Sequence, residues 1–483
     1  MSSPQSSRQH RLYIGGEWIA TASSRQNINP SDLDDVVGDY AEAEPLHVAQ
    51  AVEAAHAALP QWSRSTPQQR FDALDFIGSE ILARRQELGT LLAREEGKVL
   101  PEAIGEVIRA GHIFKFHAGE ALRIGGQALP SVRLGIEVIT SREAVGVVGL
   151  ITPWNFPIAI PAWKTAPALA CGNTVVLKPS ELTPGCAWAL ADIISRSGLP
   201  AGAFNLVLGA GAAGSALVEH PKVAAISFTG SVGVGSKIAQ HCAVSLKKFQ
   251  LEMGGKNPLV VLDDADLALA IECAVNGSFY STGQRCTASS RLIVTDGIYR
   301  QFVDALVERT RALRVGHALD ATTQIGPVVD ARQLAKNIDY LRIGKDEGGR
   351  ILCGGAHLSQ PRPGHYFSPT LIENHDPQAR LNQEEVFGPV ASILRVKNFE
   401  QALAVANDTP LGLSAGICTN SLKYATQFRR EIQAGMVMVN APTAGVDYHV
   451  PFGGTKGSSY GPREQGALAM EFYTRVKTHY IAA

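Results

Sequence analysis

The stretch of sequence that determines the fold covers residues 173–230 and reads NTVVLKPSELTPGCAWALADIISRSGLPAGAFNLVLGAGAAGSALVEHPKVAAISFTG. It contains three short apolar runs, each followed by a helical pattern; the runs are 173–178, 204–208 and 223–228, and the helical patterns are 183–197, 211–219 and 231–242. Apolar strands that alternate with helices predict a parallel sheet with right-handed crossovers. We therefore expect an α/β domain of the nucleotide-binding kind, with its ligand at the carboxyl ends of the strands.

Polar and glycine-rich motifs stand where the predicted strands end: TPWN from Thr152, KPSE from Lys178, Gly209 and FTGS from Phe228. A literal G-x-G-x-x-G at 209–214 lies between a strand and a helix, as the dinucleotide fingerprint requires, but a single match of this kind is weakly specific. The run GSVGVG at 230–235 is a competing phosphate site, where helix N-terminal amides and a serine hydroxyl would hold a pyrophosphate.

The rest of the chain predicts further elements around this unit. Apolar residues on both sides of a Gly-Gly pair predict a hairpin at 12–19, and three helical patterns follow in 45–123, with a break at Gly97 and Pro101. A second α/β region follows residue 255, with strands at 259–262 and 292–294 and helices at 267–279 and 298–313. The final run, 472–481, predicts a strand that pairs either with residues near 136–149 or with another subunit.

Composition excludes several classes of protein. The 483 residues are 45% hydrophobic and 18% charged, with a net charge of −1, which argues against nucleic acid or a membrane surface as the partner. The apolar stretch 144–163 is interrupted by three prolines, so we interpret it as strand, loop and helix start and not as a membrane span. Residues 1–10 lack the apolar core of a secretory signal.

The seven cysteines are scattered and odd in number, without metal-ligand spacing. This favours a reducing, cytoplasmic setting and predicts neither a disulfide framework nor a bound metal.

Two residues near the start of the second region are candidates for catalysis. Cys286 lies in a small-residue loop, GQRCTAS, and Glu252 precedes a Gly-Gly turn. A thiol and a carboxylate brought to one cleft can form and then hydrolyse a thioester. The competing interpretations are an inert buried cysteine and an exposed carboxylate at a strand end. Arg285, if its head points inward, would lower the pKa of the neighbouring thiol.

Asn155 also has two interpretations. It could cap the helix that begins near Pro157, or its amide could stabilise the oxyanion that acyl chemistry produces.

With these residues in view, the chain resembles the aldehyde dehydrogenase superfamily over nearly its whole length. Seven motifs occur in family order: TPWNFP at 152, KPSE at 178, FTGS at 228, LEMGGKNP at 251, GQRCTA at 283, EEVFGPV at 384 and PFGGTKGSS at 451. The resemblance implies that Cys286 is the nucleophile, Glu252 the general base for deacylation and Asn155 the oxyanion-hole amide.

The resemblance also implies a cofactor site for NAD or NADP, in which the glycines at 230–235 take the leading part and the run at 209–214 mainly packs a helix. The residues predicted to contact the cofactor are Ile151, Thr152, Pro153, Trp154, Lys178, Ser180, Glu181, Gly209, Phe228, Thr229, Gly230, Ser231, Gly254, Glu385 and Phe387. A carboxylate at 181 accepts hydrogen bonds from a ribose 2′-hydroxyl and repels a 2′-phosphate, which favours NAD, although the neighbouring Lys178 softens that penalty.

The implied architecture is a Rossmann-like parallel-sheet cofactor domain (1–122 and 146–252), an α/β catalytic domain (253–454) and a small β oligomerisation element (123–145 and 455–483). It also implies a homodimer or homotetramer.

At subfamily level, the segments from Asn440 and around the nucleophile are most similar to the bacterial α-ketoglutaric semialdehyde (2,5-dioxopentanoate) dehydrogenases. Such a substrate carries a carboxylate remote from its aldehyde, so its pocket should offer a cation or several donors. Arg285 is the candidate, with Thr287 and His449 as further lining; the alternative is that Arg285 turns outward to a structural carboxylate. Open functional alternatives are a succinate or glutarate semialdehyde dehydrogenase, a coenzyme-A-acylating enzyme and a catalytically silent binding protein.

Overall fold

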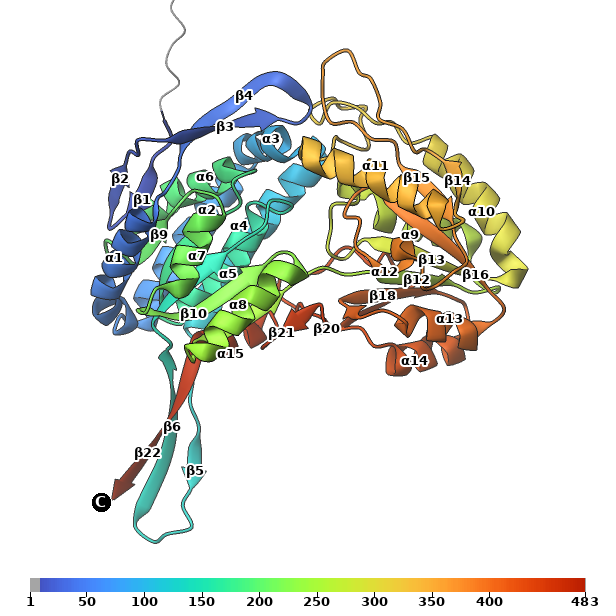
Figure 1. Cartoon of the computed structure of the whole chain (residues 1–483). Helices are drawn as coiled ribbons and strands as arrows, with labels where there is room; N and C mark the ends of the chain where they lie inside the picture. Colours follow the sequence, from blue (N-terminus) through green and yellow to red (C-terminus); the bar gives the residue numbers. More distant parts are fainter. Residues whose placement is uncertain (1–8, 483) are drawn as a thin grey trace, which may run out of the picture.

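The computed structural model describes residues 9–482 and has two lobes and a projecting arm (Figure 1). The first lobe is built on an eight-stranded sheet with the order β2-β1-β9-β8-β7-β10-β11-β21. The second lobe is built on a seven-stranded sheet with the order β14-β15-β16-β13-β12-β18-β19. Each sheet has its own buried apolar core.

The centre of the first sheet is parallel, as the sequence predicts. Its strands are β7 (Val147–Ile151), β8 (Thr174–Lys178), β9 (Phe204–Leu206), β10 (Val223–Thr229) and β11 (Lys248–Glu252). The helices between them are α5 (Ala159–Ala170), α6 (Pro184–Ser195), α7 (Gly211–Glu219) and α8 (Val232–Val244). The polar motifs at 152, 178 and 228 therefore meet at one edge of the sheet.

Four helices precede the parallel strands of this sheet, where the sequence predicts three. They are α1 (Pro45–Ser63), α2 (Pro67–Ala83), α3 (Arg85–Glu96) and α4 (Leu100–Ala121). The prediction of three is wrong because only Arg84, with φ −93° and ψ 16°, separates α2 from α3, and no glycine or proline marks that break. The break before α4 is as predicted: Gly97 ends α3 with φ +91°, a conformation that favours glycine.

The N-terminal hairpin is confirmed as β1 (Leu12–Ile14) and β2 (Glu17–Ile19). A second hairpin, β3 (Ser24–Asn29) and β4 (Asp32–Ala41), was not predicted, because its sequence is largely polar and only part of it is buried.

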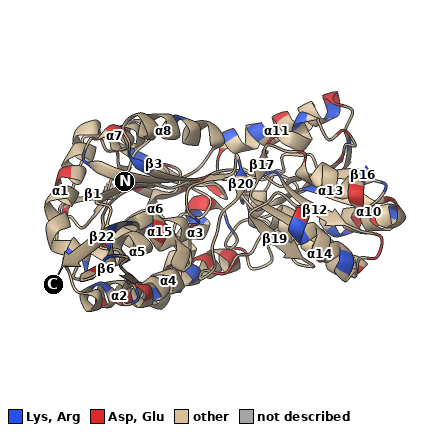
Figure 2. Ribbon diagram, turned by 90° about the horizontal axis from the view of Figure 1, so that it is seen from below, with Lys and Arg blue, Asp and Glu red and all other residues tan. Residues whose placement is uncertain are grey.

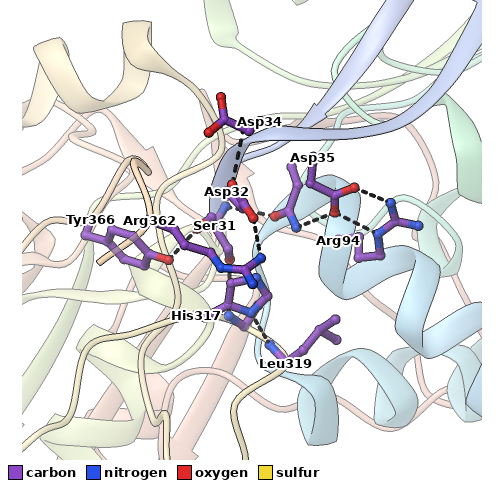
Figure 3. A network of polar contacts seen from close by, with 11 residues as sticks. Ser31, Asp32, Asp34, Asp35, Arg94, His317, Leu319, Arg362 and Tyr366 are labelled. Atoms are coloured by element: carbon purple, nitrogen blue, oxygen red, sulfur yellow. Dashed lines mark hydrogen bonds and ion pairs between the residues drawn. The ribbon is translucent and has the colours of Figure 1, made fainter. Parts of the chain in front are cut away.

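The turn between β3 and β4 connects the lobes (Figure 3). Asp32 pairs with Arg362 at 2.5 Å, and the Tyr366 hydroxyl donates to the Ser31 carbonyl at 2.6 Å. The Ser31 hydroxyl accepts from the Ala318 amide at 3.1 Å. Because Ser31 is fully buried, these contacts tie the N-terminal hairpin firmly to the second lobe.

The second lobe repeats the βα pattern. Its sheet contains β12 (Asn257–Val261), β13 (Ser289–Thr295), β14 (Arg350–Cys353), β15 (Thr370–Glu373), β16 (Val390–Val396), β18 (Ser414–Cys418) and β19 (Met436–Val439). Its helices are α9 (Leu267–Phe279), α10 (Asp296–Arg311), α11 (Ala331–Asp346), α12 (Arg380–Gln383), α13 (Phe399–Asn407) and α14 (Leu422–Glu431). The predicted elements at 259–262, 267–279, 292–294 and 298–313 are confirmed.

The segment after β19 returns to the first lobe. Strand β17 (Leu411–Gly412) pairs with β20 (Thr455–Lys456), and β21 (Ser459–Tyr460) pairs with β11 in the first sheet. The short helix α15 (Met470–Tyr473) then leads to the arm.

The arm consists of β5 (Ala128–Pro130), β6 (Ile136–Ala144) and the terminal strand β22 (Thr474–Ala482), and it extends away from both lobes (Figure 1). Strand β22 pairs antiparallel with β6 from Thr474 opposite Ala144 to Ala482 opposite Ile136. Of the two predicted pairings for the terminal strand, the structure thus has the one within the chain.

Lys and Arg side chains are interspersed with Asp and Glu over the helices of both lobes (Figure 2). Among the helices of residues 9–482, none combines the length and the apolar character needed to cross a membrane.

Candidate active site

The predicted nucleophile Cys286 lies in a loop whose backbone is strained. The turn before it, Tyr280–Gly283, contains Ser281 and Thr282 at φ +52° and +56°, which non-glycine residues rarely adopt. Both carboxylate oxygens of Glu102, on α4, accept from the Ser281 amide at 3.1 Å. Strain of this kind persists only where the surroundings enforce it, and it is common at functional sites.

Cys286, Glu252 and Asn155 line one cleft of about 210 Å³ between the lobes. Cys286 comes from the loop after α9, Glu252 from the end of β11 and Asn155 from the loop after β7. Trp163 and Phe452 also line this cleft, with ring centroids 5.4 Å apart. The structure therefore brings together the three residues that the sequence predicts to act together.

Asn155 is held by contacts on both of its ends. Its side-chain Nδ2 donates to the Gln284 carbonyl at 3.0 Å, and its own carbonyl accepts from Lys98 Nζ at 2.7 Å. Lys98 also pairs with Glu106 at 2.6 Å, and the other Glu106 oxygen accepts from the Ile158 and Ala159 amides at the start of α5. Lys98 and Glu106 therefore position the loop that carries Asn155.

Replacing Lys98 by methionine is expected to destabilise the protein by about 3–5 kcal/mol, because the buried Glu106 carboxylate loses its partner. Both side chains of this pair are nearly inaccessible, at 1% and 2% exposure. Thermal unfolding of the two variants Lys98→Met and Lys115→Met measures the effect; Lys115 on α4 pairs with Asp75 on α2, and these two side chains are 35% and 38% exposed. Equal loss of stability in the two variants would contradict the prediction.

Glu252 is fully buried among groups that control its charge. Burial raises its pKa well above the ordinary value, and the carboxylate of Glu464 adds to the rise, while the Ser459 hydroxyl opposes it by donating to Glu252 Oε2 at 2.5 Å. Lys164 pairs with Glu464 and donates to Ser227 Oγ at 2.8 Å. A carboxyl with a raised pKa can exchange protons near neutral pH, as a general base must.

Lys164 and Glu464 are functional candidates that the sequence motifs do not include. A signal for Lys164 exists, because a lysine within the otherwise apolar run AIPAWKTAPALA of α5 must be buried and therefore paired. Glu464 follows the glycine-rich loop 300 residues later, and no local pattern connects the two.

The surroundings of Cys286 raise the pKa of its thiol, whereas the sequence suggested a lowered pKa. Burial raises its pKa to about 12, and the carboxylates of Glu385 and Glu252 contribute to the rise. The backbone amides of Cys286 and Thr287 donate to the sulfur and oppose it. The surroundings therefore raise the pKa of the Cys286 thiol overall, so the lowering expected from Arg285 does not prevail.

Alkylation of Cys286 by iodoacetamide is therefore expected to accelerate by about tenfold for each pH unit between pH 7 and 9, without levelling off, because the thiolate fraction rises throughout this range. The other six cysteines are buried, so peptide mass spectrometry can follow Cys286 alone. The same peptide in urea is the control, and its rate should level off near the ordinary thiol pKa of about 8.5. A plateau near pH 7 in the native protein would contradict the prediction.

The three predicted substrate-contacting residues lie away from this cleft. The buried Arg285 guanidinium donates to the Asn276 carbonyl and faces the Glu102 carboxylate. The Thr287 side chain is buried, and its carbonyl accepts from the Thr443 hydroxyl at 2.7 Å. His449 is exposed, with its ring edge against Tyr448. Arg285 thus corresponds to the alternative of a structural pairing, turned inward and not outward.

A groove of about 950 Å³ continues from the cleft along the edge of the first sheet. Its lining includes most of the predicted cofactor-contacting residues: Ile151, Thr152, Pro153, Trp154, Lys178, Ser180, Glu181, Phe228, Thr229, Gly230 and Ser231. Gly254, Glu385 and Phe387 line the cleft itself. Gly209 lies outside both linings, packed against Ala43 and Ala213 at the start of α7.

The groove fits a dinucleotide. Within the described residues 9–482, the buried hydroxyl oxygens of Thr152 and Thr229 have no hydrogen-bond partner, and a side chain on Gly211 or Gly233 would meet no other atom within 4 Å. The Glu385 carboxylate occupies the space that a side chain at Gly254 would fill, and it accepts from the Gly255 amide at 3.0 Å. The site thus offers polar groups, open glycine surface and a helix N-terminus, which suit a pyrophosphate and two riboses.

The comparison with protein families agrees with this geometry. The model of the aldehyde dehydrogenase family matches residues 18–479. The chain belongs to the aldehyde dehydrogenase family.

Several curated family members resemble it over nearly its full length. It is 42% identical to the α-ketoglutaric semialdehyde dehydrogenase of Bacillus subtilis, covering 97% of each chain. It is 42% identical to the α-ketoglutarate semialdehyde dehydrogenase of Haloferax volcanii (97% and 98% covered) and 39% identical to the 2,5-dioxopentanoate dehydrogenase of Saccharolobus solfataricus (97% and 98% covered). Among solved structures, betaine aldehyde dehydrogenase from Staphylococcus aureus in complex with NAD+ has a TM-score of 0.96 at 34% identity, with 98% and 94% covered.

Further residues that the sequence did not single out also line the groove. They are Ser215, Val218, Lys237 and His241 on α7 and α8, and Arg332, Gln333 and Lys336 at the start of α11. The α11 residues come from the second lobe, so only the folded chain identifies them.

Proposed function

We propose that this protein oxidises 2,5-dioxopentanoate to 2-oxoglutarate with NAD, through a thioester on Cys286. The observation that carries the proposal is the meeting of Cys286, Glu252 and Asn155 in one cleft that opens into a dinucleotide-sized groove. The names of the curated relatives support the choice of aldehyde.

In the proposed mechanism the Cys286 sulfur adds to the aldehyde carbon. The oxygen that becomes negative accepts hydrogen bonds from Asn155 Nδ2 and from the Cys286 backbone amide. The amide of Asn155 contacts the Gln284 carbonyl in the structure and is held near the sulfur by that contact. The bound dinucleotide supplies the hydride acceptor for this chemistry.

Glu252 acts in the second half of the reaction. It removes a proton from water, which attacks the thioester carbon; the C–S bond breaks, the carboxylate leaves and the sulfur is released. The Ser459 hydroxyl orients the Glu252 carboxylate by a hydrogen bond. The ion pair of Lys164 and Glu464 acts on the pKa of Glu252, which Glu464 raises and Lys164 lowers. Water-assisted deacylation makes coenzyme A unnecessary.

NAD is the proposed cofactor and NADP the second candidate. Glu181 lies 3.6 Å from Lys178 Nζ, so the lysine partly neutralises the carboxylate that would repel a 2′-phosphate.

The proposed cellular location is the cytoplasm, because the seven cysteines are free and six of them are buried.

We also propose that the protein forms a homodimer or homotetramer in which the arm takes part. The proposed division into domains is the one predicted above, with residues 123–145 and 455–483 as the oligomerisation segments. The arm exposes apolar side chains fully, such as Val132 and Leu134, and Tyr480 by 64%. Exposed apolar side chains gathered on one element are typical of interfaces. Light scattering of the full chain should give a multiple of 51.4 kDa; a monomer would contradict this.

A panel of aldehydes with NAD and with NADP tests the function by absorbance of the reduced cofactor. The proposal expects the highest kcat/KM with 2,5-dioxopentanoate and NAD. Higher kcat/KM with succinic semialdehyde would favour the succinate semialdehyde alternative, dependence on coenzyme A would overturn the hydrolytic mechanism, and absence of turnover with every aldehyde would indicate a silent binding protein.

A further inference from the structure

Three buried N–H donors next to the cleft have no acceptor. They are Arg109 Nε, Trp163 Nε1 and Gln465 Nε2, and none of them has a hydrogen-bond partner in the described part of the chain. Buried polar groups are nearly always paired, so each exception needs an explanation, such as a ligand that is absent from the structure. Three donors without an acceptor at one place indicate a ligand rich in acceptors.

Arg109 contacts the other two side chains. Arg109, on α4, donates from Nη2 to Gln465 Oε1 at 2.9 Å, and its guanidinium lies 5.8 Å from the ring centroid of Trp163. Gln465 adopts φ +59°, a strained value for a non-glycine residue, so the backbone is constrained where it presents this side chain. We call Arg109, Trp163 and Gln465 the donor cluster.

The charge of Arg109 is not compensated. Within residues 9–482, no carboxylate oxygen lies within 4.0 Å of its guanidinium nitrogens, although Glu106, Asp447 and the Cys286 sulfur are the charged or titratable groups that face it. Glu106 is already paired with Lys98, and Asp447 is exposed. A cation whose Nε is buried without a partner is costly, and a planar guanidinium suits a carboxylate that accepts two hydrogen bonds.

The donor cluster adjoins the reacting atoms. Trp163 lines the same cleft as Cys286 and Asn155, and the Arg109 guanidinium lies on this ring. Arg285 cannot serve, because its guanidinium faces Glu102 and Asn276.

We propose that the donor cluster binds the 2-oxo-carboxylate end of the substrate while its aldehyde carbon is held at Cys286. The inference rests on the proposed function and refines it. Arg109 pairs with the carboxylate, and the indole N–H and the amide of Gln465 donate to the carboxylate and to the neighbouring ketone oxygen. The cluster therefore distinguishes a 2-oxo acid from a plain carboxylate and from a neutral aldehyde of equal length.

Three substrates of equal chain length test this assignment: pentanal, 5-oxopentanoate and 2,5-dioxopentanoate. For Arg109→Met, kcat/KM for the two acids should fall by roughly 10- to 100-fold, mainly through KM, while kcat/KM for pentanal stays within about threefold. Arg109→Lys should recover part of the loss, because a lysine supplies the charge without the fork. Gln465→Ala should lower kcat/KM for 2,5-dioxopentanoate more than for 5-oxopentanoate.

The matched control is Lys115→Met, two turns further along α4, which should leave kcat/KM unchanged for all three substrates. If Arg109→Met lowered kcat/KM equally for all three substrates, the role of Arg109 would be structural and the proposal would be overturned. It would also be overturned if the variant discriminated between the acids and pentanal as the wild type does. If the wild type itself prefers pentanal, the proposed function fails, and the assignment fails with it; if the wild type prefers the dioxo acid and Arg109→Met keeps that preference, only the assignment fails.

A second measurement holds even if Arg109→Met folds poorly. In the wild type, 2-oxoglutarate should slow the alkylation of Cys286 more strongly than pentanoate at the same concentration. In Arg109→Lys, that difference should shrink by roughly tenfold. Equal protection by both anions in the wild type would overturn the proposal.

Discussion

Replacing Cys286 by alanine is expected to lower the rate of aldehyde oxidation by roughly 10⁴-fold or more, because no other group in the cleft can form the thioester. Besides this thiol, the cleft is lined by two carboxylates, two amides, two hydroxyls, a lysine and several aromatic side chains, and Cys286 is the one thiol among its described residues. The measurement is the rate of NADH formation at saturating aldehyde, with binding of NAD to the variant followed by titration. If the variant still binds NAD but no longer forms NADH, the loss of activity lies in the chemical step.

The matched control is Cys353→Ala on β14. Cys353 is buried in the second lobe, and it contributes to an apolar core away from the cleft. This variant should keep nearly full activity. If Cys286→Ala retained more than a few per cent of the wild-type rate, the nucleophile would have to be another residue.

Replacing Glu252 by glutamine is expected to stop the reaction after one turnover. The first half-reaction needs the thiol and the oxyanion donors, so a burst of NADH equal to the number of sites should remain. Steady-state turnover should fall by about 10²- to 10⁴-fold, because the water loses its general base. Rapid-mixing absorbance separates the two phases, and mass spectrometry should find the acyl group on Cys286.

The pH dependence of the wild type follows from the same carboxyl group. Since the pKa of Glu252 is raised, it is protonated and inactive as a base at low pH, and deacylation should accelerate as the pH rises through its pKa. Glu252→Gln should lose this dependence, whereas Glu400→Gln, on the exposed side of α13, should retain it. A Glu252→Gln variant without a burst would contradict the order of events proposed here.

The sequence predicted the elements that carry strong local signals. The parallel strands β8 and β10 are short apolar runs followed by helices, and Gly97 with Pro101 marks the start of α4. The strands β3 and β4 lack such a signal, because their stability comes from contacts with α3 and the second lobe.

Side-chain direction within the site was less predictable. Motif spacing identified Cys286, Glu252 and Asn155 as candidates, and the fold brings them together. Spacing could not tell that Arg285 turns toward Glu102, since that orientation depends on α4, about 180 residues earlier in the chain. The donor cluster was missed for the same reason: Arg109, Trp163 and Gln465 come from three separate segments, and each has an ordinary local context.

The return of the chain to the first lobe after β19 affects how the enzyme is made. Ser459, Glu464 and Gln465, which act on Glu252 and Arg109, are synthesised after the whole of the second lobe. An unfinished chain that ends before residue 455 carries the thiol and the carboxylate but lacks the contacts that orient them. Competence for aldehyde oxidation is thus acquired only after residue 465 has been synthesised, so a chain terminated earlier keeps Cys286 without an oriented general base to hydrolyse an acyl adduct.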